Sequence, residues 1–157
     1  MGKKTATLFS ACTESAALSM EVDADSIECT RLFGKYVGIC FQIKDDIFDY
    51  FDDREIGKPT GNDMLEGRLT LPVIYALNTT GDESAKKIAL KIKQREANLG
   101  EINELTNFAK QHNGIEYAHK MMNEYKEKAL ALLSVFPDTD VKRALVTYVD
   151  YMIERKK

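Results

Sequence analysis

The sequence predicts an all-α protein with a single domain. No segment of its 157 residues alternates apolar and polar side chains as a half-exposed β-strand would. Apolar residues instead recur at helical spacing, in stretches separated by Gly, Pro, Asn and Asp. The length and the 44% hydrophobic content suffice for one sizeable core. We therefore expect helices packed around one core, with no second domain and no internal repeat.

The first predicted helix covers about Lys4 to Met20 and is rich in small side chains. The small residues are Ala6, Ser10, Ala11, Cys12, Ser15, Ala16 and Ala17. A face built from such residues permits a second helix to approach closely.

The second predicted helix begins with Asp23 or Asp25 as its N-cap and runs to about Phe51. Its apolar residues are Leu32, Phe33, Tyr36, Val37, Ile39, Cys40, Phe41, Ile43, Ile47, Phe48 and Phe51. Because these residues occupy most of the helix circumference, this helix is expected at the centre of a bundle.

A loop over residues 57–63 follows, since one proline and two glycines make this segment non-helical. A short apolar helix is then predicted from about Leu69 to Leu77. Pro72 lies near its start and Gly81 after its end, which are the favoured positions of these residues at helix termini.

Four further segments complete the predicted helices. Polar amphipathic helices are expected at about Asp82 to Asn98 and Glu101 to His112, with Asn113-Gly114 as a C-cap. Another helix runs from Ile115 to Phe136 on a 3.6-residue period. Pro137-Asp138 ends that helix, and Asp138 can cap the last one. The apolar side of the last helix consists of Ala144, Leu145, Tyr148, Val149 and Met152.

Charge and composition exclude some classes of function. The net charge is −3, no basic face dominates and no nucleic-acid reader motif occurs, so nucleic acid is not an expected partner. No stretch approaches 18 uncharged apolar residues, so no transmembrane segment is predicted. The N-terminus lacks the apolar core of a signal peptide, and we expect a cytoplasmic protein.

The cysteines and histidines do not form a metal-binding pattern. Cys12, Cys29 and Cys40 are odd in number and contain no CxxC pair, so we interpret them as buried small hydrophobes in a reducing compartment. His112 and His119 are seven residues apart and match no metal-ligand spacing, which favours structural or surface roles.

The candidate site is an acidic cluster inside the second helix. At about 100° per residue, Asp45 and Asp49 lie roughly 40° apart, and Asp46 lies about 60° beyond Asp49. Gln42 falls in the same arc. Carboxylates at this density repel each other unless a cation neutralises them. Mg²⁺ suits such oxygen ligands, since it binds one or two carboxylates together with phosphate oxygens and water.

Two interpretations of the cluster remain. It can be a Mg²⁺-diphosphate site or a solvated acidic stripe at a helix end. The apolar neighbours of the three aspartates favour the first, because acids on a mostly buried helix need a compensating charge.

Four motifs stand in a fixed order along the chain. They are Lys4-Thr5-Ala6, Phe41-Gln42-x-x-Asp45-Asp46-x-x-Asp49, Gly57-Lys58-Pro59-Thr60-Gly61-Asn62-Asp63 and Glu66-Gly67-Arg68-Leu69-Thr70-Leu71-Pro72. This combination closely resembles the C-terminal half of the trans-isoprenyl diphosphate synthases, the polyprenyl synthetase family. The resemblance is nearest to bacterial long-chain members such as octaprenyl diphosphate synthase. It extends along the chain, but from Asp82 onward only the helical pattern is similar.

The resemblance implies an antiparallel helix bundle of the isoprenoid synthase type and typically a homodimer. Members of this family condense an allylic diphosphate with isopentenyl diphosphate to make a polyprenyl diphosphate. Two aspartate-rich motifs and three Mg²⁺ ions hold the allylic diphosphate at the mouth of an apolar cavity. The allylic group ionises, isopentenyl diphosphate attacks the carbocation, and a proton leaves to the departing diphosphate.

The family roles carry over to individual residues. Asp45, Asp46 and Asp49 match the second aspartate-rich motif, with Asp45 as a direct metal ligand and the other two as direct or water-mediated partners. Lys4 and Lys58 match lysines that bind the allylic diphosphate, which fits lysine as a point charge. The other matched residues are Thr5 and Gln42, whose oxygens face the carbocation, and Arg68, a cationic position near the same site.

The chain also departs from the family pattern. No second Asp-Asp-x-x-Asp occurs in it, because Asp52-Asp53 is followed by Arg54-Glu55. We therefore expect these 157 residues to be the C-terminal portion of a polyprenyl synthetase domain, present as a fragment, a truncation or a partner-dependent subunit. Little activity is expected from them alone. Apolar faces left uncovered on the first two helices predict a species larger than a monomer.

Two other classes of function remain open. A class I terpene cyclase would share the fold and the metal-dependent ionisation, although its second motif usually contains Asn, Ser and Glu. A non-catalytic helical interaction module would use the acids as a solvated or partner-binding stripe.

Overall fold

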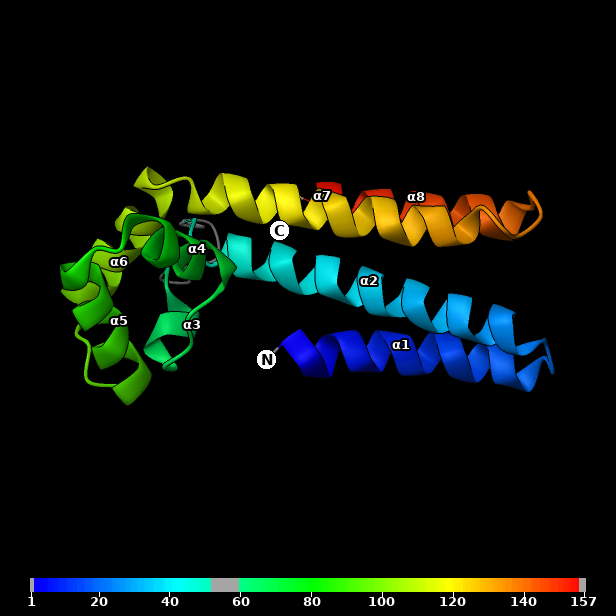
Figure 1. The fold of residues 1–157 in the computed structure, drawn as a ribbon, viewed down its shortest axis with the longest axis horizontal. Helices are drawn as coiled ribbons and strands as arrows, with labels where there is room; N and C mark the ends of the chain where they lie inside the picture. The colour runs from blue at the N-terminus through cyan, green and yellow to red at the C-terminus, as the bar shows by residue number, and fades with distance from the viewer. Residues whose placement is uncertain (1, 52–59, 156–157) are drawn as a thin grey trace. The chain divides into compact units, whose positions relative to one another are not determined.

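The computed structural model describes residues 2–51 and 60–155, and within these ranges all regular structure is helical (Figure 1). The predicted all-α class is therefore confirmed. The chain divides into two compact units, one formed by Met1–Lys44 with Met121–Lys157 and the other by Asp45–Lys120. Each unit is described by itself below.

Two helical hairpins build the first unit. In one, α1 (Gly2–Ser19) is followed by an antiparallel α2 (Ala24–Phe48); in the other, α7 (Gly114–Leu133) is followed by α8 (Asp140–Glu154) (Figure 1). Tyr36 of α2 lies against Tyr125 of α7, with ring centroids 5.8 Å apart. The Cys40 thiol donates a hydrogen bond to the carbonyl oxygen of Met122, at 3.3 Å. Helix α2 is thus covered by α7 on one side, as expected of a central helix.

Small residues bring α1 and α2 together on the other side of α2. A Cβ atom on Gly34 would lie 2.2 Å from Thr13 Oγ1 and 2.5 Å from the carbonyl oxygen of Phe9. The Ser10 hydroxyl, facing α2, donates to the carbonyl oxygen of Arg31 at 3.0 Å. The close approach predicted from the small-residue face of α1 is confirmed, and glycine on α2 contributes to it as well.

The opposite face of α1 is exposed. Leu8 and Leu18 on this face are 63% and 55% exposed, and Met20, just after the helix, is 74% exposed. Cys12 lies on this exposed face, so the prediction that all three cysteines are buried is wrong for Cys12. Cys40 is fully buried, and burial raises the pKa of its thiol to about 12.

Four helices follow one another in the second unit. They are α3 (Asn62–Leu65), α4 (Leu71–Thr80), α5 (Glu83–Gln94) and α6 (Leu99–Gln111). Helix α6 packs against α3, α4 and α5. The buried side chains of the second unit include Met64, Val73, Ala76, Ile88, Ile92, Ile102, Leu105 and Ala109.

Local sequence signals explain the ends of α4, α5 and α6. Pro72 lies in the first turn of α4, and Gly81 ends that helix with φ 68°, as predicted. The Asp82 carboxylate caps α5 by accepting from the amide of Ala85 at 2.8 Å. Asn98 and Glu101 form a reciprocal capping box at the start of α6.

Several predicted boundaries differ from the structure. Helix α2 ends at Phe48 rather than Phe51, and α3 begins at Asn62, inside the segment predicted as a loop. Helix α5 ends at Gln94 because Arg95 adopts the left-handed conformation, with φ 62°. The left-handed conformation of a non-glycine residue gives no clear sequence signal, which explains the overextended prediction.

Capping explains the remaining differences. Asp23, one of the two predicted N-caps, caps α2 by accepting from the amide of Ser26 at 2.9 Å. Thr139, not Asp138, caps α8 through the amide of Lys142 at 3.2 Å. Asp138 instead pairs with Arg143, at 3.0 Å. The C-cap of α6 is His112, and Gly114 already belongs to α7.

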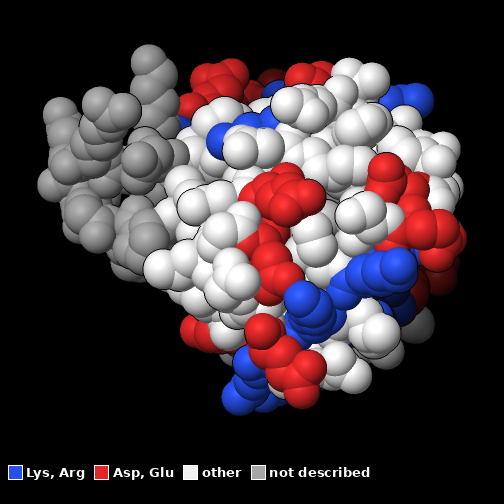
Figure 2. Space-filling view, turned by 90° about the vertical axis from the view of Figure 1, so that its left-hand side faces the viewer, with Lys and Arg blue, Asp and Glu red and all other residues white. Residues whose placement is uncertain are grey.

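Charged side chains of both signs are interspersed on the face of the molecule drawn in Figure 2. Among the described residues, no helix combines the length and the apolar character needed to cross a membrane.

We expect Gly34→Ala to destabilise the chain by about 1–3 kcal/mol, because the added methyl group overlaps Thr13 and the backbone of Phe9. Alanine at a helix position without this contact would stabilise it by roughly 0.5–1 kcal/mol. Urea unfolding followed by circular dichroism measures the change. Lys35→Ala, at the exposed neighbouring position, serves as control and is expected to stay within about 0.5 kcal/mol of the original chain. A stabilising Gly34→Ala would contradict the close packing of α1 and α2.

Candidate functional site

The predicted acidic cluster lies where α2 ends. Asp45 and Asp46 occupy the last turn of α2, Asp49 directly follows the helix, and all three are partly buried. The last turn of a helix carries unpaired carbonyl groups and the negative end of the helix dipole, so carboxylates there are electrostatically unfavourable. No basic residue lies in the last turn of α2. Positive charge or hydrogen-bond donors are therefore needed to stabilise carboxylates at this end of the helix.

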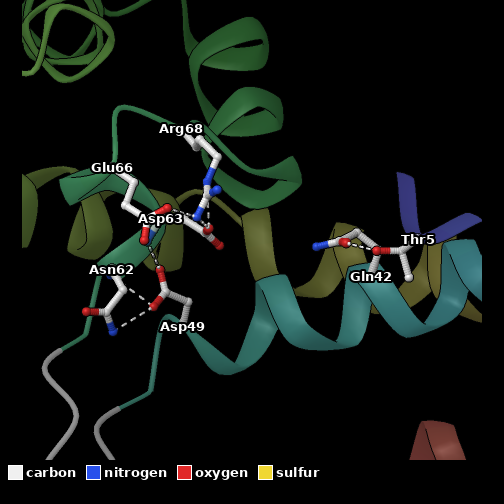
Figure 3. Close-up of polar contacts among 7 residues, drawn as sticks. All are labelled: Thr5, Gln42, Asp49, Asn62, Asp63, Glu66 and Arg68. Carbon is white, nitrogen blue, oxygen red and sulfur yellow. Dashed lines mark hydrogen bonds and ion pairs between the residues drawn. The ribbon is translucent and has the colours of Figure 1, made fainter. Parts of the chain in front are cut away.

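Backbone amides at the start of α3 supply such donors to Asp49 (Figure 3). The amide of Asn62 donates to Oδ1 and the amide of Asp63 to Oδ2, both at 3.0 Å. The side-chain amide of Asn62 adds a longer contact to Oδ1, at 3.4 Å. In addition, the amide of Gly61 donates to the main-chain oxygen of Asp49 at 2.9 Å. Asp49 thus accepts hydrogen bonds from three successive residues, Gly61, Asn62 and Asp63.

The conformation of Gly61 makes this arrangement possible. Gly61 has φ 81°, in the left-handed region that favours glycine. A Cβ atom at this position would also lie 2.6 Å from Cγ2 of Ile102 on α6. The chain can therefore turn at Gly61 and present the unpaired first-turn amides of α3 to a carboxylate.

Arg68 forms the next layer around Asp49. Its guanidinium contacts Asp63 Oδ1 through Nε at 3.1 Å and Nη2 at 2.9 Å, and it also pairs with Glu66 (Figure 3). Burial and the nearby charge of Asp49 raise the pKa of Asp63, while Arg68 acts in the opposite direction. Arg68 thus compensates a second carboxylate beside Asp49.

The residue after Asp49 is also fixed. Tyr50 is almost fully buried, and its hydroxyl is hydrogen-bonded to Thr70 Oγ1 at 2.8 Å. Burial raises the pKa of the Tyr50 phenol, so the hydroxyl stays protonated at neutral pH. Thr70 is the residue immediately before α4. This contact ties the end of the aspartate-rich motif to the start of α4.

Thr5 and Gln42 are brought together within the first unit. The Thr5 hydroxyl donates to the Gln42 side-chain oxygen at 3.0 Å (Figure 3). Lys4 is exposed in the first turn of α1. The pairing of Thr5 with Gln42 agrees with their assignment to one site, and their role toward a carbocation stays a prediction.

Two further predicted residues are Arg68 and Lys58. Arg68 contacts Asp63 and Glu66, and Lys58 falls outside the described residues. Sequence reasoning missed Asn62 and Asp63 as partners of Asp49. The signal that could have found them is the glycine followed by two polar residues before Met64-Leu65, a pattern that favours a helix start.

The donor set fits magnesium bound together with a diphosphate. Within residues 2–51 and 60–155, no three His, Cys, Asp or Glu side chains form a group that could hold a metal ion by themselves. Mg²⁺ does not require such a cage, since it usually takes one or two carboxylates plus phosphate oxygens and water. Adjacent carboxylates on the last turn of α2 meet that requirement.

Comparison with known proteins decides the family. The family model described as polyprenyl synthetase matches residues 1–109. This chain belongs to the polyprenyl synthetase family. The resemblance predicted from the four motifs is therefore confirmed, and the match favours neither the cyclase nor the interaction-module alternative.

Individual members of the polyprenyl synthetase family agree with this assignment. A crystal structure of geranylgeranyl pyrophosphate synthase from Bacteroides thetaiotaomicron is 56% identical, with a TM-score of 0.92, over 96% of this chain and 50% of that one. A crystal structure of a polyprenyl synthase from Caulobacter crescentus CB15, complexed with calcium and isoprenyl diphosphate, is 30% identical to this chain. Its TM-score is 0.85, and the match covers 99% of this chain and 48% of that one. A probable mitochondrial hexaprenyl pyrophosphate synthase of Neurospora crassa is 34% identical over 98% of this chain and 33% of that protein. The chain thus spans a third to a half of the length of these relatives.

Arg68→Gln is expected to destabilise this polyprenyl synthetase chain by about 1–2 kcal/mol, because Asp63 would keep its charge beside Asp49 without the guanidinium. Urea unfolding at neutral pH provides the measurement. Lys86→Gln is the control, since it removes an exposed pair with Glu83 that contributes about 0.5 kcal/mol or less. Equal effects of the two substitutions would show that Arg68 does not stabilise the acidic site.

Proposed function

We propose that this chain provides a Mg²⁺-diphosphate site of a polyprenyl diphosphate synthase. The observation that carries the proposal is the group of acids at the end of α2 in a chain of the polyprenyl synthetase family. The Caulobacter relative, complexed with calcium and isoprenyl diphosphate, supports a site for a divalent cation and a prenyl diphosphate.

The proposed reaction joins an allylic diphosphate to isopentenyl diphosphate. The bond between C1 and oxygen of the allylic diphosphate breaks, and its electrons leave with the diphosphate. The double bond of isopentenyl diphosphate supplies the electron pair of the new carbon–carbon bond. The departing diphosphate takes the proton that is then lost, and the product is a longer prenyl diphosphate.

Each candidate residue has a defined part in this proposal. Asp45 and Asp46 would hold magnesium, with Asp49 as a water-mediated partner. Bound magnesium would neutralise the negative charge that develops on the leaving diphosphate. Lys4, Lys58 and Arg68 would add positive charge toward the diphosphate.

Thr5 and Gln42 would contribute oxygen atoms toward the allylic cation. Their hydrogen bond supports this role because it restricts the rotation of both side chains before substrate binds. A fixed dipole stabilises a developing charge without first having to reorient.

Location and assembly remain predictions. A cytoplasmic location is proposed, while the Neurospora relative is named as mitochondrial. The exposed apolar side chains Leu8 and Leu18 on α1, and Met20 just after it, support the proposal that the chain works as part of a larger assembly, such as a homo-oligomer.

Inorganic diphosphate together with Mg²⁺ is expected to raise the melting temperature of the chain, whereas either alone raises it less. Ligand binding to the folded state stabilises by RT ln(1 + [L]/Kd), about 2.7 kcal/mol at a hundredfold excess over Kd. Asp45→Asn should abolish most of the shift. Asp140→Asn, with a side chain 98% exposed on α8, is the control and should leave the shift unchanged. A rise in melting temperature of equal size in Asp45→Asn would show that Asp45 does not take part in binding.

The 157 residues alone are expected to show little prenyl transfer, because they contain one Asp-Asp-x-x-Asp motif where the family resemblance implies two. Steady-state incorporation of labelled isopentenyl diphosphate into an allylic diphosphate measures the activity. The full-length Bacteroides synthase provides the positive control. Robust turnover by the isolated chain would contradict the need for a second motif.

A further inference from the structure

Asp49 lies between the end of α2 and the residues that lead into α3. We propose that Asp49 is the anchor of the aspartate-rich motif rather than one of its metal ligands, holding the end of α2 against the start of α3. The inference rests on the proposed function for the metal-binding roles of Asp45 and Asp46. The anchoring itself follows from hydrogen bonds.

The carboxylate of Asp49 is engaged on both of its oxygen atoms. Oδ1 accepts from the backbone amide of Asn62 and has the longer contact with its side chain, and Oδ2 accepts from the backbone amide of Asp63. A cation bound directly to either oxygen would lie near N–H groups that carry partial positive charge. Turning the carboxylate toward a cation would leave two partly buried amides without their acceptor, which is unfavourable.

The backbone of Asp49 completes the connection. Its main-chain oxygen accepts from the amide of Gly61 at 2.9 Å, and its own amide donates to the main-chain oxygen of Asp45 at 3.3 Å. Asp49 is therefore hydrogen-bonded to α2 on one side and to residues 61–63 on the other. A shift of the last turn of α2 would have to break these contacts or carry α3 along.

Arg68 strengthens the far side of the anchor. It contacts the Asp63 carboxylate through two nitrogen atoms, and its own amide donates to the main-chain oxygen of Asp63 at 2.8 Å. Arg68 therefore fixes the position of Asp63, whose backbone amide donates to Asp49. This two-layer arrangement is that of a positioning residue with its own support.

Amide hydrogen exchange measured by NMR on the chain without ligand tests the anchor directly. Asp49→Ala should speed exchange at the amides of Asn62 and Asp63 by at least about tenfold. Asp49→Asn should speed it less, because asparagine keeps one carbonyl acceptor. Asp45→Asn serves as the matched control and should leave both amides unchanged. Unchanged exchange in Asp49→Ala would overturn the proposal.

Calorimetric titration with Mg²⁺ and inorganic diphosphate separates an anchor from a ligand. An anchor predicts that Asp49→Ala weakens binding about tenfold, while Asp49→Asn stays within about threefold of the original chain. Asp45→Asn should weaken binding at least about tenfold, because an amide cannot replace a charged ligand. Equal losses in Asp49→Asn and Asp45→Asn would make Asp49 a ligand and overturn the proposal.

Failure of the proposed function remains distinguishable in this design. If the original chain binds no Mg²⁺-diphosphate, the metal-binding proposal fails, whereas the amide-exchange result alone then upholds or overturns the anchor.

Discussion

Repulsion among carboxylates at the negative end of α2 is the constraint on which the site depends. A helix terminus with unpaired carbonyl groups favours cations, yet Asp45, Asp46 and Asp49 gather there. The structure compensates Asp49 with backbone amides from α3, which lie at the positive end of that short helix. Part of the acidic charge is therefore balanced by the fold itself.

The rest of the second unit supports this balance. Gly61 turns the chain so that two successive amides face one carboxylate, and Ile102 of α6 leaves no room for a larger residue there. Arg68 offsets the charge of Asp63, which would otherwise add to that of Asp49. Buried Tyr50 fixes the next residue to Thr70. Local backbone geometry, ion pairing and core packing thus converge on the residues that follow α2.

Much of the fold can be predicted from the sequence, because helices depend on apolar periodicity and on residues that favour helix ends, such as Pro72 and Gly81. The acidic cluster was also visible, since three aspartates in an apolar helix violate the usual pattern. The partners of Asp49 are harder to predict. Gly61 followed by two polar residues indicates a helix start, but the packing of Gly61 against Ile102 of α6, distant in sequence, gives no local signal. The exposure of Cys12 was likewise unpredictable, since a small-residue helix face does not reveal which side a neighbour covers.

The division of roles among the three aspartates bears on how a metal would be held. With Asp49 engaged by amides, the motif offers the adjacent carboxylates of Asp45 and Asp46, too few for the full oxygen shell of Mg²⁺. In the proposed site, the remaining ligands would come from water, from a polyanionic substrate and from the second aspartate-rich motif that the family resemblance implies. On this reasoning metal and diphosphate stabilise each other in the site, because the diphosphate supplies oxygen ligands and the metal reduces its repulsion from the aspartates. An anchored, incomplete ligand set therefore favours a metal that arrives with its substrate over one that resides permanently in the protein.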